Sequence, residues 1–403
     1  MRAEGRSRAR RQRKRDHGSL SVPAPDRRSA TVATIDLTAL AHNLSEVRRL
    51  IPSACRIFAV VKADAYGHGL IEVSRVLARH NVGGFAVATV QEAVLLRNAG
   101  IREPVLVMAG LLPEELPDLV RYGLTPVVYD LAFVQRLAEQ IPVDAAPWPV
   151  HLKLDTGMGR LGLTPAEAWE ALQRIRAGGH LRVEGLMTHL ADADSADPAY
   201  TNSQLARLDT MVARIREADI SIPLIHAAGT AGILSHPASH RDAVRPGIML
   251  YGYHTCARLT TPVFLKPVLC VTTKVVQVRT VAQGESVSYN RTFIATRPSR
   301  IAVLPVGYAD GYSRTLSDRA AVLVRDRRAP VVGRVCMDLT MIDVSDVPGA
   351  AAGDEVVLIG RQGSESITAD DLATWQDSIP YDVLCAIGPR VPRIFRPDET
   401  ARN

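Results

Sequence analysis

One lysine stands directly after an apolar run and ahead of a tyrosine, a histidine and two glycines. The stretch is AVVKADAYGHG, residues 59–69, and its lysine is Lys62. A lysine at the edge of an apolar layer loses hydration, so it releases its proton more readily and the free amine can attack a carbonyl group. A lysine that simply reaches from a strand end into water has the same local pattern. Position alone favours this simpler interpretation.

Two later segments carry small residues that could cradle a phosphate. HAAGTAG contains Gly229 and Thr230 after an apolar run, and RPG, residues 245–247, lies inside the next apolar run. In barrels of eight βα units, the loops after strands 7 and 8 often bind phosphate through backbone N–H groups. A lysine opposite a phosphate cradle suggests pyridoxal 5′-phosphate, an aldehyde that carries a phosphate.

The segments that must hold these groups alternate between apolar runs and helical spacing from about residue 32 to residue 262. A first helix follows Asp36 and runs from Leu37 to Leu50, and further helices are expected at 90–98, 113–122, 165–177 and 201–218. Eight continuously apolar runs indicate strands that are buried on both faces: IFAVV, GFAVAT, PVLVMAG, TPVVYD, VHLKLD, VEGLMTH, IPLIHAA and VRPGIMLYG. This alternation predicts a (β/α)8 TIM-type barrel, with a doubly wound sheet as the alternative.

The pattern changes after residue 265. Runs rich in β-branched residues, such as VLCVTTKVVQVRTV and APVVGRVCMDLTMIDV, are separated by Gly, Pro and Asp and show little helical spacing. The predicted fold class is therefore α/β, with a cofactor-binding barrel over residues 31–265 and a mostly-β domain over 266–403. Residues 1–30 are predicted to form a disordered basic tail.

Composition and charge limit the classes of function. The formal net charge of +6 arises in the first 30 residues, which hold ten Lys and Arg against three acidic residues, so the remaining chain is near neutral. Nucleic-acid binding is therefore an alternative for the tail alone. The chain shows neither the apolar segment of a secretory signal nor a run long enough to span a bilayer. Five cysteines without C-x-x-C pairs indicate reduced thiols and no metal site, hence a cytoplasmic protein.

Longer blocks of the chain resemble the alanine racemase family. AVVKADAYGHG is similar to the family's cofactor-lysine signature, and HLKLDTGMGRLGL, VRPGIMLYG, GESVSYNRTF, LPVGYADGYSR and GRVCMDLTMIDV follow in the family's order. The resemblance runs from about residue 34 to residue 395. It implies a pyridoxal 5′-phosphate enzyme that interconverts L-alanine and D-alanine and supplies D-alanine for peptidoglycan. It also implies a homodimer in which each chain lends Tyr289 and Met337 to the site of the other.

The resemblance implies a role for each matching residue. Lys62 would bind the cofactor aldehyde and act as the base on one face of the substrate Cα, and Tyr289 would be the base on the other face. Arg245 would contact the pyridine nitrogen and, as a group that only donates, leave it unprotonated, which favours return of the proton to Cα over transamination. Arg160 and Met337 would bind the substrate. Further cofactor contacts are implied for Tyr66, His189, Thr230, Gly247, Ile248 and Tyr381.

Some positions depart from the family pattern. Gly229 and Thr230 stand where the family usually has Asn-Ser, and Asn290 and Arg291 replace a small pair directly after Tyr289. The second change is expected to alter substrate specificity. The resemblance also implies that Lys153, seven residues before Arg160, can be carbamylated so as to orient that arginine.

Several other functions remain open. The protein could racemise another amino acid or a broader range, such as serine or lysine, in a dedicated pathway. It could be a decarboxylase of the same two-domain type, although those enzymes use an acidic partner for the ring nitrogen where this chain has Arg245. A cofactor-carrying protein built on the same barrel would lack the β domain that supplies Tyr289.

Overall fold

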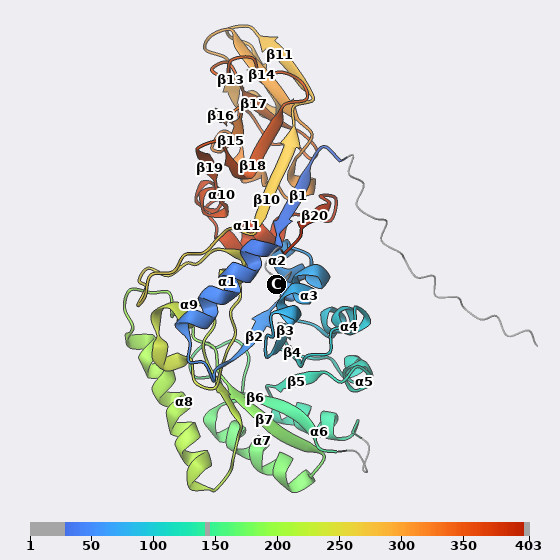
Figure 1. The fold of residues 1–403 in the computed structure, drawn as a ribbon, viewed down its shortest axis with the longest axis vertical. Helices are drawn as coiled ribbons and strands as arrows, with labels where there is room; N and C mark the ends of the chain where they lie inside the picture. Colours follow the sequence, from blue (N-terminus) through green and yellow to red (C-terminus); the bar gives the residue numbers. More distant parts are fainter. Residues whose placement is uncertain (1–28, 142–145, 399–403) are drawn as a thin grey trace, which may run out of the picture.

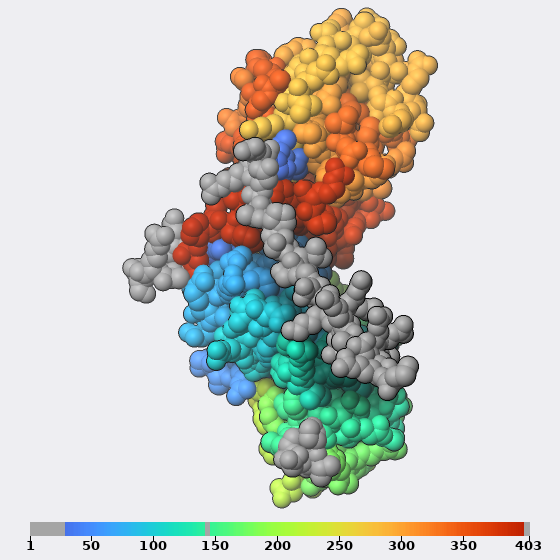
Figure 2. Space-filling model, turned by 90° about the vertical axis from the view of Figure 1, so that its right-hand side faces the viewer, coloured from blue at the N-terminus to red at the C-terminus, as the bar shows by residue number. Residues whose placement is uncertain are grey.

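The protein has two lobes. A computed structural model describes residues 29–141 and 146–398, so the predicted tail lies almost wholly outside the described residues. Figure 1 shows an α/β lobe at one end and a mostly-β lobe at the other, with helix α11 (Pro380–Ala386) where they meet. Figure 2 shows the C-terminal segment, in red, lying between the two lobes.

Eight parallel strands form the sheet of the α/β lobe, in the order β8-β7-β6-β5-β4-β3-β2-β9. The strands are β2 (Arg56–Val60), β3 (Gly84–Val87), β4 (Val105–Val107), β5 (Thr125–Val128), β6 (Trp148–Lys153), β7 (Leu181–Met187), β8 (Leu224–His226) and β9 (Ala243–Val244). Hydrogen bonds from Asp242 N to Ile225 O and from Arg245 N to Ala228 O join the two end strands. The sheet is therefore a nearly closed barrel, as predicted, and the doubly wound alternative was wrong.

Helices cover the outside of the barrel (Figure 1), which explains why its strands are apolar on both faces. They are α1 (Leu37–Leu50), α3 (Leu70–Arg79), α4 (Val90–Asn98), α5 (Leu116–Arg121), α6 (Leu131–Ala138), α7 (Pro165–Gly178), α8 (Ala199–Glu217) and the short α9 (Thr230–Ser235). Asp36 caps α1 as predicted, since its carboxylate accepts a hydrogen bond from Ala39 N at 2.9 Å. None of the helices in the described part of the chain has the length and apolar character needed to cross a membrane.

The eighth apolar run differs from its prediction. Only its beginning forms a strand, β9, and Ile248–Tyr251 is a 3₁₀ helix. Pro246 lacks the N–H group that a strand would use, so the ladder ends before it. Arg245 therefore follows the strand, Gly247 precedes the 3₁₀ helix, and Ile248 begins it at the barrel mouth.

The second lobe is built on three small sheets. The largest has the order β16-β15-β18-β10-β1-β20, with β19 added to β18, and the others are β11-β14-β17 and β12-β13. Its strands are β10 (Leu269–Lys274), β11 (Gln277–Val281), β12 (Ser286–Val287), β13 (Phe293–Ile294), β14 (Ser299–Leu304), β15 (Ala321–Val324), β16 (Arg327–Pro330), β17 (Thr340–Asp343), β18 (Glu355–Gln362), β19 (Glu365–Ile367) and β20 (Arg393–Arg396). The mostly-β prediction is confirmed. Strand β1 (Val32–Asp36) also belongs to this lobe, because it pairs with β10 and β20, although the sequence placed it in the barrel segment.

Candidate active site

A cavity of about 650 Å³ opens at the carboxyl ends of the barrel strands. This end of a barrel is where its loops gather reactive groups. The second lobe contributes to the wall through helix α11. Nine predicted site residues line the cavity together: Lys62, Tyr66, Arg160, His189, Thr230, Arg245, Gly247, Ile248 and Tyr381.

Lys62 begins a left-handed turn, α2 (Lys62–Gly67). The four residues Ala63–Tyr66 have φ of 53° or 54° and ψ between 41° and 53°. Such a conformation costs an L-residue roughly 1–2 kcal/mol, so contacts must hold the turn. Glu92 supplies one, since its carboxylate accepts a hydrogen bond from Ala63 N at 2.6 Å, and Asp64 supplies another by accepting from Leu70 N at 2.7 Å. The turn directs Lys62 and Tyr66 to the same cavity.

The Tyr66 hydroxyl lies against the backbone of Gly247. A Cβ atom added at Gly247 would be 2.6 Å from the hydroxyl oxygen, so only glycine leaves room for this tyrosine. The Tyr66 side chain is buried, and burial raises the pKa of its hydroxyl above the ordinary value. It is therefore a neutral hydrogen-bond donor at the cavity wall.

Unused donors gather beside Tyr66. The Thr230 hydroxyl oxygen accepts hydrogen bonds from Gly247 N at 3.2 Å and Met249 N at 3.4 Å, so its own proton is free to be donated. Ile248 is fully buried, yet within the described residues its N–H group has no acceptor. Buried N–H groups are almost always paired, so this loop fits an anionic ligand such as a phosphate.

Both terminal nitrogens of the buried Arg245 guanidinium are hydrogen-bonded, whereas among the described residues its Nε is not. It is 4% exposed, and its Nη1 donates to His226 Nδ1 at 2.7 Å and to His226 O at 3.1 Å. Its Nη2 donates to the carbonyl oxygens of Thr188 at 2.6 Å and Ala227 at 2.9 Å. These bonds use four of the five N–H groups, and within the described chain the Nε–H has no acceptor. Burial lowers the pKa of Arg245 to about 10, so the guanidinium keeps its proton at neutral pH.

Two buried imidazoles continue from Arg245 into the barrel, and sequence reasoning missed both. His226 Nε2 lies 2.8 Å from His151 Nδ1, and His151 Nε2 lies 3.7 Å from the Glu184 carboxylate. Because a guanidinium can only donate, His226 must accept at Nδ1 and donate at Nε2. The available signal was a histidine inside each of two otherwise apolar strand runs, VHLKLD and IPLIHAA.

Positive charge is crowded around Lys153 in this cavity. Lys153 is 6% exposed, and burial followed by repulsion from Arg160 and Arg245 lowers its pKa to about 8. Burial, reinforced by Arg245, lowers the pKa of His189 to about 3, so this ring is neutral at physiological pH. An anionic ligand or modification in this part of the cavity would relieve the repulsion.

The last two predicted residues do not line this cavity. Tyr289 and Met337 lie in the second lobe and are 69% and 53% exposed. Tyr289 lines a separate cavity of about 550 Å³ together with Cys336 and Leu339. Met337 lies in a tight turn closed by a hydrogen bond from Cys336 N to Leu339 O at 2.8 Å, and its own N–H group finds no acceptor in the described part of the chain.

Comparison with known proteins shows the same two-part organisation. Models of the alanine racemase N-terminal and C-terminal domains match residues 35–255 and 268–395. An alanine racemase of Halothermothrix orenii is 42% identical over 91% of this chain and 97% of its own length.

Solved structures agree with this relationship. That of alanine racemase from E. faecalis has a TM-score of 0.88 at 32% identity and covers 93% of this chain and all of its own. That of alanine racemase from Bartonella henselae, which holds covalently bound pyridoxal phosphate, has a TM-score of 0.82 at 28% identity and covers 91% of this chain and all of its own. The residues around the cavity and both halves of the fold lead to one conclusion: the chain belongs to the alanine racemase family.

Proposed function

We propose that this protein is a pyridoxal 5′-phosphate-dependent alanine racemase that interconverts L-alanine and D-alanine. The observation that carries the proposal is the buried Arg245, which lines the same cavity as Lys62 and Thr230 and keeps one N–H group without an acceptor in the described residues. This arrangement fits a flat ring with an acceptor nitrogen, an aldehyde and a phosphate. The relatives are named as alanine racemases, which supports alanine as the substrate.

The cavity offers a partner for each part of this cofactor. Lys62 would bind the aldehyde covalently, and Arg245 Nε would donate to the pyridine nitrogen. The phosphate would accept from the N–H group of Ile248 and from the hydroxyl groups of Tyr66, Thr230 and Tyr381, while His189, as a neutral ring, would stack near the pyridine. When bound, pyridoxal phosphate draws electrons from the Cα of the amino acid and makes its proton acidic.

Racemisation needs a base on each face of the substrate Cα, because the proton must leave from one side and return from the other. Lys62 would serve one face. Tyr289 is exposed and stands apart from the barrel cavity of its own chain, which supports a head-to-tail homodimer. In it, Tyr289 of the partner subunit would serve the other face.

The remaining groups would orient the substrate and restrict the reaction. Arg160 and the N–H group of Met337 of the partner subunit would bind the substrate carboxylate. Arg245 supplies a donor, so the ring nitrogen would stay unprotonated and the negative charge developing at Cα would be short-lived. This outcome favours racemisation over decarboxylation, which calls for an acidic partner at that nitrogen.

The test is a substrate panel on the purified enzyme with its cofactor. We expect rapid formation of D-alanine from L-alanine, and we expect borohydride to attach the cofactor permanently to the peptide that contains Lys62. Tyr289→Phe should abolish racemisation while the bound cofactor's absorbance persists. Tyr122→Phe should leave both intact, because Tyr122 is half-buried against the core and does not line the cavity. Attachment at another residue would refute the cofactor site.

A broader substrate range is the second candidate. It is favoured by Arg291, two residues after Tyr289, whose Nε donates to the Ser286 hydroxyl at 3.1 Å. Ser286 and Tyr289 line the same cavity, so this contact holds a cation beside that cavity. Faster racemisation of serine or lysine than of alanine would establish it.

We further infer, from the composition and the family resemblance, a cytoplasmic enzyme that supplies D-alanine for peptidoglycan. We also propose a division of the sequence at residue 265 into a barrel domain, 31–265, and a β domain, 266–403, with β1 as a strand of the first range that pairs in the second lobe. Growth of a deletion strain only with added D-alanine would support the role in the cell wall.

A further inference from the structure

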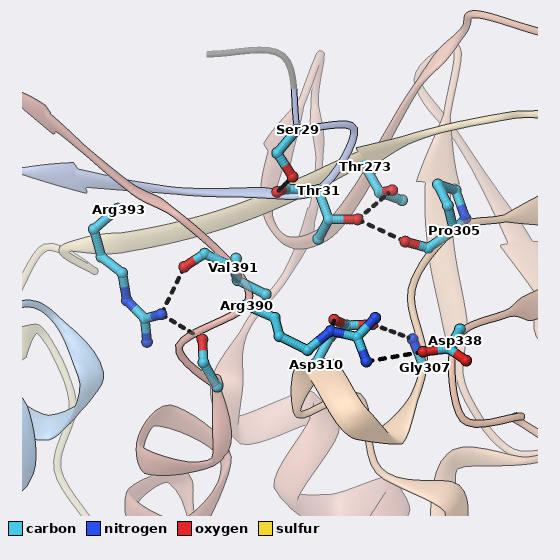
Figure 3. A network of polar contacts seen from close by, with 11 residues as sticks. Ser29, Thr31, Thr273, Pro305, Gly307, Asp310, Asp338, Arg390, Val391 and Arg393 are labelled. Carbon is cyan, nitrogen blue, oxygen red and sulfur yellow. Dashed lines mark hydrogen bonds and ion pairs between the residues drawn. The ribbon is translucent and has the colours of Figure 1, made fainter. Parts of the chain in front are cut away.

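A short segment near the C-terminus, Gly388–Arg393, contacts functional turns of both lobes, and we call it the anchor segment. Arg390 lies between two carboxylates from different parts of the second lobe (Figure 3). Its Nε is 3.2 Å from Asp310 Oδ1, and its Nη1 donates to Asp338 Oδ1 at 2.8 Å. Arg390 therefore joins two segments that are distant in sequence.

These two segments form one unit around Met337. Asp338 is the residue after Met337 in the turn Cys336–Leu339, which we call the Met337 turn. The N–H groups of Tyr308 and Ala309 donate to the carbonyl oxygens of Cys336 and Met337, at 3.1 and 3.0 Å. Asp310 closes the supporting turn by accepting from Gly307 N at 3.0 Å. With its bond to Asp338, Arg390 is the side-chain clamp on this unit.

The other end of the anchor segment contacts the turn that begins with Lys62 of the same chain. Arg393 Nε donates to the carbonyl oxygen of Gly67 at 3.0 Å, and Gly67 ends the left-handed turn that Lys62 begins. Arg393 Nη1 donates to the carbonyl oxygens of Gly388 and Val391, at 2.6 and 2.7 Å, so the loop is held in shape. A backbone bond from Gly388 N to Asp310 O at 3.0 Å completes the connection.

We propose that Arg390 is a positioning residue that sets the Met337 turn through Asp338 and Asp310, and that it acts on the active site of the partner subunit. This inference rests on the proposed function, in which each chain lends its Met337 turn to the other chain. The anchor segment then links the cofactor turn of one site to the substrate turn of the next.

The expected effect is on substrate binding rather than on folding. Arg390 and Asp338 are 53% and 56% exposed, and ion pairs at such exposure contribute little to stability. The Asp310 side chain is only 9% exposed, but without Arg390 its carboxylate would still accept from Gly307 N. Loss of the ion pairs of Arg390 would instead allow the Met337 N–H group to change its orientation. A contact made equally to bound substrate and transition state raises KM and leaves kcat almost unchanged when it is removed. Lysine cannot replace the arginine, because a single ammonium does not span two carboxylates as a planar guanidinium does.

The first experiment compares Arg390→Ala, Arg390→Lys and a control, Arg328→Ala, in the holoenzyme. Arg328 belongs to the same lobe, is 45% exposed and pairs with Glu365 at 2.9 Å. We expect KM for L-alanine to rise about tenfold in both Arg390 variants, within the range of coupling in charged networks, with unchanged cofactor absorbance and melting temperature. An unchanged KM, or an equal rise in Arg328→Ala, would overturn the proposal.

The second experiment asks which chain Arg390 serves. A heterodimer of a Lys62→Ala chain and a Tyr289→Phe chain keeps one intact composite site, with its Lys62 from the second chain and its Tyr289 and Met337 from the first. Arg390→Ala should raise KM when it is placed on the Lys62→Ala chain and leave KM unchanged on the other chain. The reverse pattern would refute action on the partner's site. If the heterodimer without Arg390→Ala is inactive, the two-chain site itself fails, which is a separate result.

Discussion

Replacing Gly247 with alanine adds one atom to the proposed phosphate site, the cofactor cradle formed by Tyr66, Thr230 and Ile248. The new Cβ would lie 2.6 Å from the Tyr66 hydroxyl oxygen and 3.3 Å from the ring carbon that bears it. The first distance is a collision, and the second is a tight contact that small shifts can relieve. The backbone of Gly247 has a negative φ, so the substitution does not force an alanine into the left-handed region. The substitution should therefore act through the Tyr66 hydroxyl.

The magnitude follows from the bond that the displaced hydroxyl would lose. A hydrogen bond to a charged group is worth roughly 1.5–3 kcal/mol. Since each 1.4 kcal/mol is about a tenfold change in affinity, we expect the Kd for pyridoxal 5′-phosphate to rise roughly 10- to 100-fold. Tyr66→Phe should give a loss of the same size, because it removes the same donor.

The assay is an absorbance titration of the apoenzyme with the cofactor for both single variants and the double variant. Once the hydroxyl is gone, Gly247→Ala meets little resistance, so it should add almost nothing in the Tyr66→Phe background. Independent sites would give additive losses. Additivity of the two changes would therefore refute the steric reasoning, and normal affinity in Gly247→Ala would refute the role of Tyr66 in the cradle.

Three further outcomes are expected. Glu92→Gln should lower the free energy of unfolding by roughly 1–3 kcal/mol and loosen the cofactor, because the acceptor of Ala63 N at 2.6 Å loses its charge; urea unfolding checks this against Glu72→Gln on the surface. Acid should destabilise the fold: burial lowers the pKa of His68 to about 4 and of His189 to about 3, so between pH 6.5 and 4 the unfolded chain binds more protons. Each histidine should lower the free energy of unfolding by about 1.6 kcal/mol as the pH falls from 6.5 to 5, and a urea-unfolding free energy that stays constant over this range would contradict the prediction. Lys153, with a pKa near 8, should react with CO₂ as the free amine, so bicarbonate should raise activity at pH 8 in the native enzyme and leave Lys153→Gln unaffected.

The positions of many elements could be predicted because local signals determine them. The helix expected at 90–98 is α4 (Val90–Asn98), and its start is fixed by a capping box between Thr89 and Glu92. The strand before Lys62 was recognisable because a continuous apolar run of five residues suits a buried parallel strand. These patterns placed Lys62 at the barrel mouth without any knowledge of its neighbours.

Other features depend on contacts that no local pattern encodes. Strand β1 (Val32–Asp36) joins the second lobe through partners more than 200 residues away, so its apolar character could not tell it from a barrel strand. The left-handed turn Ala63–Tyr66 contains no glycine, and its composition argues against its conformation. The turn is held by hydrogen bonds to groups outside it, among them the Glu92 carboxylate, which accepts from Ala63 N, and the Arg393 guanidinium, which donates to Gly67 O.

The sequence pattern alone does not tell which of the two departures, at Gly229 or at Thr230, matters for the cavity, but the contacts of the two residues distinguish them. A Cβ at Gly229 would meet only ordinary contacts, with His189 Cε1 at 3.6 Å the nearest, so the site does not require glycine. The organising role belongs to Thr230, whose hydroxyl accepts from Gly247 N and Met249 N and so ties the loop after β9 to the start of α9. A serine hydroxyl, usual at this position in the family, has the same hydrogen-bonding groups. Thr230 therefore supplies the hydroxyl group that holds the loop after β9 and the start of α9 together.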